Sequence, residues 1–359
     1  MPHHAIARRP AHWVLACLAA LSCSGCSILA YEGYEDYIAA PAVANPLSCK
    51  LLKASAYAYE VNSTGAINDP QLAKLLDENG EAYGVVNNAQ GMTDQDRDAA
   101  YVWHSYNEVI IAFRGTLPYP AGGGSGEAQE LSFQDWVNDA DYAAQPDPDL
   151  GLVHKGFLDS FDNLWPGILK QIQGWLKADK LSANAKVYVT GHSKGGAIAR
   201  LAALKLKAGR WLPVTEVDTF GAPRVGGPSF AAKYAAAGLT DNRYENDDDL
   251  VPHVPFDQRE LAEMPLLQKL MSLGGNQPGD YVSVGQLHFI KQDGTIISLA
   301  DPDAEAQLDD TRMAEFGQLL LNSPDDAGNT IVAAHALGDL GPTDSSRYFQ
   351  AVCGAPAKQ

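Results

Sequence analysis

The chain has 359 residues, and its apolar share of 46% is that of a globular protein with a sizeable core. Its formal net charge is -18 at pH 7. This acidity excludes the basic footprint that nucleic-acid binding requires, and it excludes electrostatic docking on anionic lipid headgroups. We interpret it as a contribution to solubility.

The first residues have the layout of an export signal. Arg8 and Arg9 precede the apolar run "WVLACLAAL", which is too short to span a membrane, and small residues follow it. The end "SGC" resembles a bacterial lipobox, in which the cysteine is lipidated and becomes the new N-terminus, although Cys23 stands where that motif prefers leucine. We therefore expect residues 1–25 to be a signal peptide and Cys26 to be lipidated. The expected location is the bacterial cell envelope, as an outer-membrane lipoprotein, or the medium if the signal is simply cleaved.

Only Cys49 and Cys353 lie beyond this segment, near opposite ends of the chain. In an exported protein this arrangement predicts one disulfide that ties the termini together. The alternative is two unpaired thiols.

Beyond the signal, β-type runs alternate with helical patterns. Residues 26–45, rich in Ala, Tyr and Pro, are expected to form a tether. The predicted elements are helices over 46–61 and 70–79, two strands within 99–115 around a turn at Asn107, a long amphipathic helix over 154–178 in which Pro166 marks a kink or break, a strand over 186–190, a helix over 194–208, a strand over 214–220, a helix near 229–236 and a strand near 242–246. This alternation predicts an α/β fold with a mostly parallel sheet and helices on both faces. Because the rhythm continues without a linker, residues 46–359 are expected to form a single domain.

The corner "GHSKG" between a strand and a helix is the strongest local signal. Gly191, Ser193 and Gly195 fit the nucleophile-elbow pattern G-x-S-x-G, and the required strand and helix flank it directly. At so sharp a corner, side chains two residues to either side of the serine would clash with the backbone, and glycines remove those clashes. Ser193 is therefore the candidate nucleophile, at the carboxyl end of the sheet.

A serine nucleophile needs a base, and the base needs an acid that orients it; on this kind of fold both follow the serine in the chain. Three aspartates at 247–249 follow a later strand, and an acidic calcium-type loop is the alternative interpretation. Of the histidines downstream, His253 follows the acids too closely in the chain to reach the serine as a separate segment. His288 lies in an alternating strand, where a packed role is expected, so His335 near the C-terminus is the preferred base.

The oxyanion of the reaction needs hydrogen-bond donors already in place. One is the backbone N–H of Lys194, the residue after the nucleophile. The second must come from the end of an earlier strand. "IIAFRGT" ends such a strand, and Thr116 there offers both a backbone N–H and a hydroxyl.

Taken together, these segments resemble the class 3 lipases. The matching pieces are "IIAFRGT", "DWVNDADY", "VHKGF", "VYVTGHSKGGAIARLAA", "FGAPRVG", "DLVPHVP" and a late histidine, in the family's order. The resemblance implies an α/β-hydrolase fold with Ser193 as nucleophile, Asp249 as the acid before "LVP", and His335, followed by the Tyr348 segment, as base. It also implies an oxyanion role for Thr116 and a disulfide between the termini.

The resemblance further implies hydrolysis of lipid esters, with no metal or organic cofactor. A phospholipase A1 or a feruloyl-type esterase with the same triad is an alternative, and a non-catalytic envelope-anchored binding protein is a second. Two departures from the family concern access to the site. Residues 117–134 form a longer, glycine-rich insertion that we expect to act as a lid, and the apolar stripe within 260–273 is the other lid candidate.

If Cys26 is lipidated, Cys26→Ser should release the protein from membranes, because the acyl chains anchor it. Fractionation of cells that produce each form measures this. A wild-type protein found free in the medium would instead indicate ordinary signal cleavage.

Overall fold

The computed structural model describes residues 45–67, 80–87, 98–117, 144–209, 212–263, 280–322, 330, 333–337 and 346–354. The predicted signal peptide, the lipidated cysteine, the tether, the helix over 70–79 and most of both lid candidates lie outside these residues. Those interpretations therefore stay predictions. Within the described parts, no helix has the length and apolar character needed to cross a membrane.

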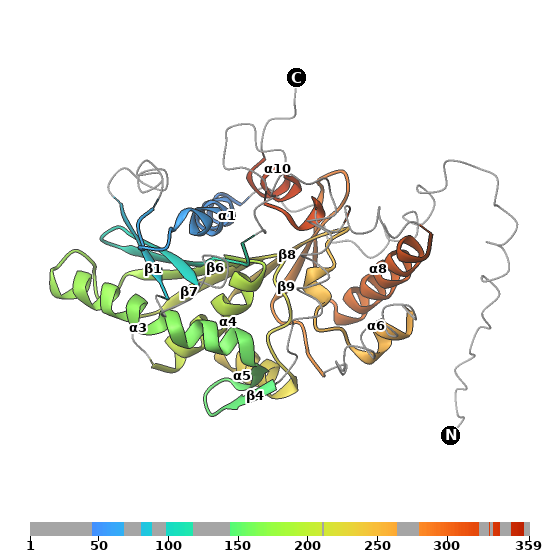
Figure 1. Cartoon of the computed structure of the whole chain (residues 1–359), viewed down its shortest axis with the longest axis horizontal. Helices are drawn as coiled ribbons and strands as arrows, with labels where there is room; N and C mark the ends of the chain where they lie inside the picture. Colours follow the sequence, from blue (N-terminus) through green and yellow to red (C-terminus); the bar gives the residue numbers. More distant parts are fainter. Residues whose placement is uncertain are drawn as a thin grey trace, which may run out of the picture. The chain divides into compact units, whose positions relative to one another are not determined.

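An eight-stranded sheet forms the middle of the fold, and its central strands are parallel, as predicted (Figure 1). The outer strand pairs are antiparallel. In spatial order the strands are β1 (Glu81–Val86), β2 (Ala99–His104), β3 (Glu108–Phe113), β6 (Lys186–His192), β7 (Val214–Phe220), β8 (Asp241–Asn246), β9 (Gln286–Ile290) and β10 (Ile296–Leu299). A separate two-stranded sheet pairs β4 (Ala144–Asp147) with β5 (Gly151–His154).

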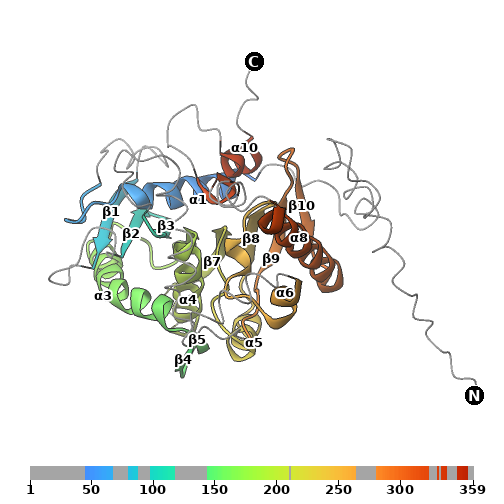
Figure 2. The same cartoon turned by 45° about the vertical axis from the view of Figure 1, so that its right-hand side comes forward.

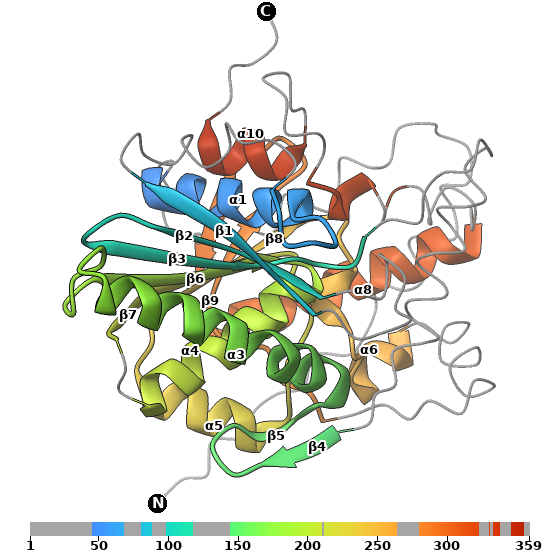
Figure 3. The same ribbon diagram turned by 60° about the vertical axis from the view of Figure 1, so that its left-hand side comes forward.

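Helices cover both faces of the large sheet (Figure 3). One face carries α1 (Pro46–Tyr57) and α10 (Arg347–Cys353), and the other carries α3 (Lys155–Lys177), α4 (Lys194–Gly209) and α5 (Pro228–Ala237). Side chains of β3 alternate between the two layers: Ile110 packs in the cluster with α1, whereas Ile111 packs in the cluster with α3 and α4. Strands buried on both faces explain the nearly continuous apolar runs in the sequence. α3 continues across Pro166, so the proline does not end this helix.

Shorter elements complete the described fold around the last strands. The helices α6 (Gln258–Glu263) and α8 (Pro302–Asn322) lie at the β9–β10 end of the sheet (Figure 2), with α8 packed on β10 and α6. Two 3-10 turns are η4 (Ala58–Glu60), which follows α1, and η5 (Val251–His253).

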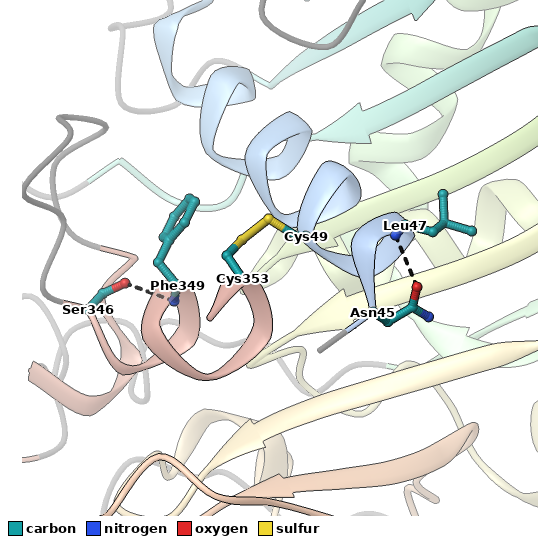
Figure 4. The surroundings of a disulfide bond; sticks show 6 residues. All are labelled: Asn45, Leu47, Cys49, Ser346, Phe349 and Cys353. Carbon is teal, nitrogen blue, oxygen red and sulfur yellow. Dashed lines mark hydrogen bonds between the residues drawn. A yellow bond between two sulfur atoms is a disulfide. The ribbon is translucent and has the colours of Figure 1, made fainter. Parts of the chain in front are cut away.

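The structure contains the predicted disulfide between the two ends of the domain (Figure 4). Cys49 lies in α1 and Cys353 ends α10, 304 residues later in the chain. The Asn45 side chain caps the start of α1, and Ser346 caps the start of α10. The bond therefore joins two capped helices on the same face of the sheet.

Replacing both Cys49 and Cys353 by Ser should lower the free energy of unfolding. The closed loop is long, and the chain-entropy contribution of such a loop is about 5 kcal/mol, with measured effects often smaller. Denaturant unfolding of the variant and of the wild type, both without reductant, measures the difference. Equal unfolding midpoints would show that the bond contributes nothing to stability.

Candidate active site

Ser193 lies at the corner between β6 and α4 and has a left-handed backbone, with φ of +57°. Such a conformation is strained for a residue other than glycine. A Cβ atom on Gly191 would lie 2.3 Å from the carbonyl carbon of Gly195, and one on Gly195 would lie 2.0 Å from the Phe113 carbonyl oxygen. Gly191 is therefore required for the close approach of β6 to the start of α4, and Gly195 for the packing of the corner against β3. The sequence pattern predicted such clashes at both positions.

The structure brings Asp249 and His335 together across 86 residues of chain, with Nδ1 of the histidine 2.9 Å from Oδ2 of the aspartate. Asp249 follows β8 and its side chain is 0% exposed, whereas that of His335 is 19% exposed. Oδ1 of Asp249 accepts the backbone N–H of Val251 at 3.0 Å, and Oδ2 also accepts the hydroxyl of Tyr348 at 3.0 Å. Both oxygens of the buried carboxylate thus accept hydrogen bonds, and the carboxylate holds the Nδ1 edge of the imidazole ring.

Gly221, directly after β7, makes room for this pair. Its φ is +56°, and a Cβ atom there would lie 2.7 Å from Asp249 Oδ2, 2.8 Å from the Tyr348 hydroxyl and 3.0 Å from His335 Nδ1. No side chain fits that space. The sequence reasoning did not single out this residue, although a glycine that ends a β-run at the carboxyl edge of a sheet is a usable signal.

His192, the residue before the candidate nucleophile, contacts the segment that contains His335. Its Nε2 lies 2.7 Å from the backbone oxygen of His335, and the two rings are 4.6 Å apart. A carbonyl only accepts, so Nε2 carries the hydrogen. Burial and the neighbouring His335 keep the pKa of His192 well below its ordinary value, so the ring is neutral. Nδ1 therefore accepts the hydroxyl of Tyr59 in η4, at 2.8 Å.

The end of β3 lies against the serine corner, where the oxyanion donors were predicted. A Cβ atom on Gly115, the residue before Thr116, would lie 2.9 Å from Ser193 Cβ, so the chain closely approaches the candidate nucleophile at this point. Lys194 is the first residue of α4. Its ammonium donates to Asp98 at 2.8 Å, which fixes the side chain toward the start of β2.

The other candidate residues have different partners. His288 lies between Ser298 Oγ at 2.7 Å and Asn242 Oδ1 at 3.1 Å, and burial with Arg243 nearby lowers its pKa to about 4. Asp248 pairs with Arg347 at 3.4 Å.

The third histidine, His253, belongs to a group with Glu260, which is also buried, and Asp309, which is half-buried. Within the described segments, the ligand atoms of these three residues are close enough together to surround a cation. The aspartates at 247–249 do not form such a group there. Both carboxylate oxygens of Glu260 are 2.6 Å from the guanidinium of Arg224, however. Glu260 is thus already neutralised, and the group does not suit a metal ion.

Part of the chain matches a family of known proteins. Residues 122–259 match the family model described as "Lipase (class 3)". This segment is less than half of the chain, and over it the chain is similar to the class 3 lipases. The matched segment includes Ser193 and Asp249, while Thr116 and His335 lie outside it.

The chain matches only part of the length of its curated relatives. A lipase of Rhizomucor miehei is 36% identical over 156 residues, which is 42% of this chain and 38% of the relative. "Secreted mono- and diacylglycerol lipase A" of Penicillium cyclopium is 30% identical over 156 residues, 43% of this chain and 45% of the relative. The chain therefore spans less than half the length of these relatives. Among solved structures, lipase II of Rhizopus niveus matches with a TM-score of 0.50 and 25% identity, over 71% of this chain and 84% of that one.

If Asp249 and His335 act as a unit with the serine, Asp249→Ala and His335→Ala should each lower kcat/KM for a soluble ester on the order of 10⁴-fold. Asp248→Ala and His288→Ala are the matched controls, since neither side chain bonds to the pair. We expect both controls to retain activity, with His288→Ala less stable. Equal losses in Asp249→Ala and Asp248→Ala would contradict the assignment of the acid.

Proposed function

We propose that the protein hydrolyses carboxylic esters of lipids through an acyl-enzyme on Ser193. The observation that carries this proposal is the hydrogen bond between His335 and the buried Asp249. His192, the residue before the strained Ser193, bonds to the backbone of His335 at the carboxyl edge of the parallel strands. A serine hydroxyl becomes a nucleophile only when an oriented base takes its proton. The names of the relatives, several of which are lipases, support the same reaction class.

In the proposed reaction Ser193 attacks the ester carbonyl, and His335 takes its proton and passes it to the leaving alcohol. Asp249 stabilises the imidazolium that forms in between. Among the described residues no hydrogen bond yet joins Ser193 Oγ to His335, and in free enzymes such bonds often tighten only in the substrate complex. Water then hydrolyses the acyl-enzyme.

The oxyanion of each tetrahedral intermediate is bound by two backbone N–H groups, those of Thr116 and Lys194. What supports this is the close approach of Gly115 to Ser193 and the position of Lys194 at the start of α4, since helix N-termini favour negative charge. Donors fixed before the reaction begins cost no reorganisation when the charge develops.

We infer that the protein is exported and that Cys26 anchors it in the envelope. The Cys49–Cys353 disulfide supports export, because disulfides persist in oxidising compartments. A curated relative is described as secreted. The anchoring itself rests on the lipobox-like end of the signal.

Ser193→Ala should abolish ester hydrolysis, on the order of 10⁴- to 10⁶-fold, because the other members of a triad act through the nucleophile. Labelling with a fluorophosphonate probe should disappear with it. Ser182→Ala, in a surface turn, is the matched control and should keep both. Assays on a triglyceride, a phospholipid and a short p-nitrophenyl ester, run side by side, identify the preferred ester.

A folded wild-type protein that takes no fluorophosphonate label would contradict the proposal and would indicate a binding protein on a hydrolase fold. Retained labelling in Ser193→Ala would place the nucleophile elsewhere.

A further inference from the structure

An additional helix lies between the acid and the base in the chain. The residues between Asp249 and His335 include β9, β10 and α8, and α8 packs against β10 and α6. In this position α8 lies beside the end of β8, from which the acid loop, residues 246–249, emerges (Figure 2). Arg312 of α8 makes hydrogen bonds to this loop.

The guanidinium of Arg312 holds three backbone carbonyls of the acid loop. Its Nη2 donates to the oxygens of Asn246 at 2.9 Å and Asp249 at 3.0 Å, and its Nε donates to the oxygen of Asp247 at 3.3 Å. Its Nη1 donates to the Glu245 carboxylate at 2.8 Å. The Arg312 side chain is 2% exposed. The rigid, planar guanidinium of Arg312 thus makes three of its hydrogen bonds to the backbone of one short loop.

The charge of this group is permanent. Burial alone would lower the pKa of Arg312, but the charge of Glu245 raises it above its ordinary value. Burial alone would likewise raise the pKa of Glu245, but the guanidinium groups of Arg243 and Arg312 lower it to about 2. Both partners are therefore ionised at neutral pH, so the hydrogen bonds to the loop are charge-assisted.

The same loop is tied to the base. The side-chain amide of Asn246 donates to the backbone oxygen of Ala334 at 2.6 Å, and Asp249 bonds to the His335 ring. A displacement of the loop therefore moves the carboxylate and the histidine segment together. Misplacement of catalytic groups by about 1 Å can cost on the order of 100-fold in rate.

We propose that Arg312 is a positioning residue for the reaction: it fixes the loop that carries Asp249 and thereby the orientation of His335. This inference rests on the proposed function, in which Asp249 and His335 form the catalytic pair. The competing role is a structural one, in which Arg312 only neutralises Glu245.

Arg243 separates the two roles. It is buried to the same degree, at 3% exposure, and it also binds Glu245. Among the described residues its hydrogen bonds go to Glu245 and Glu305, and none goes to a carbonyl of the acid loop. Removing it disturbs the same buried charges but leaves the three loop contacts of Arg312 in place.

The test compares Arg312→Met, Arg312→Lys and the control Arg243→Met in the full-length protein. For each variant, kcat and KM are measured on a soluble p-nitrophenyl ester, and the thermal midpoint is measured alongside. A proton NMR spectrum at acid pH follows the low-field resonance of the His335 Nδ1–H···Asp249 bond, assigned by its loss in His335→Ala.

We expect Arg312→Met to lose ~10- to 100-fold in kcat with KM unchanged and to lose or broaden the resonance. Arg312→Lys should recover part of both, and Arg243→Met should lose stability but keep kcat and the resonance.

Equal kcat losses in Arg312→Met and Arg243→Met would overturn the proposal, and so would wild-type kcat with an intact resonance in a folded Arg312 variant. If Arg312→Met does not fold, Arg312→Lys carries the comparison, since it keeps the charge but not the fork of donors. A wild-type protein that hydrolyses no ester would refute the proposed function, and the NMR resonance would then still decide whether Arg312 orders the pair.

Discussion

The Asp249 carboxylate has no exposed surface, and a buried carboxylate is tolerated only when its oxygens are hydrogen-bonded. The groups that donate these hydrogen bonds must therefore meet at the carboxyl edge of the sheet. One partner, Val251, lies in the following turn, and the other two come from distant segments: Tyr348 in α10 and His335 in the segment before it. Each of them must be in place before the charge can be buried. The folded chain therefore cannot satisfy this one side chain without also assembling the candidate acid–base pair.

The first described helix supports that assembly from two sides. At its beginning, Cys49 holds α10 through the disulfide, and α10 carries Tyr348 to the carboxylate. Just after its end, Tyr59 in η4 bonds to His192, and His192 bonds to the backbone of His335. A helix far from the candidate triad in the sequence is thus part of the support of that site.

Much of the fold and the serine corner could be read from the sequence, because they depend on residues a few positions apart. Two β-type runs around a turn at Asn107 predicted the β2–β3 hairpin, and the spacing of Gly191, Ser193 and Gly195 predicted the strained corner. The choice of Asp249 among three aspartates came from resemblance to a family, not from spacing. Helix α8 was missed, because "PDAEAQLDDTRMAEFGQLLLN" has no clear apolar stripe, and its role depends on the single buried Arg312.

What the sequence determined by itself is therefore the local chemistry: a serine at a strained corner after a strand, and acids and histidines after it in the right order. Only the tertiary structure decided which of them meet. His335 reaches Asp249 across 86 residues, whereas His288 is stacked on Tyr244 and His253 is bound to Glu260. The physical reason is that a side chain's partner across a folded sheet is set by the packing of distant segments, and no periodicity within one segment records that packing.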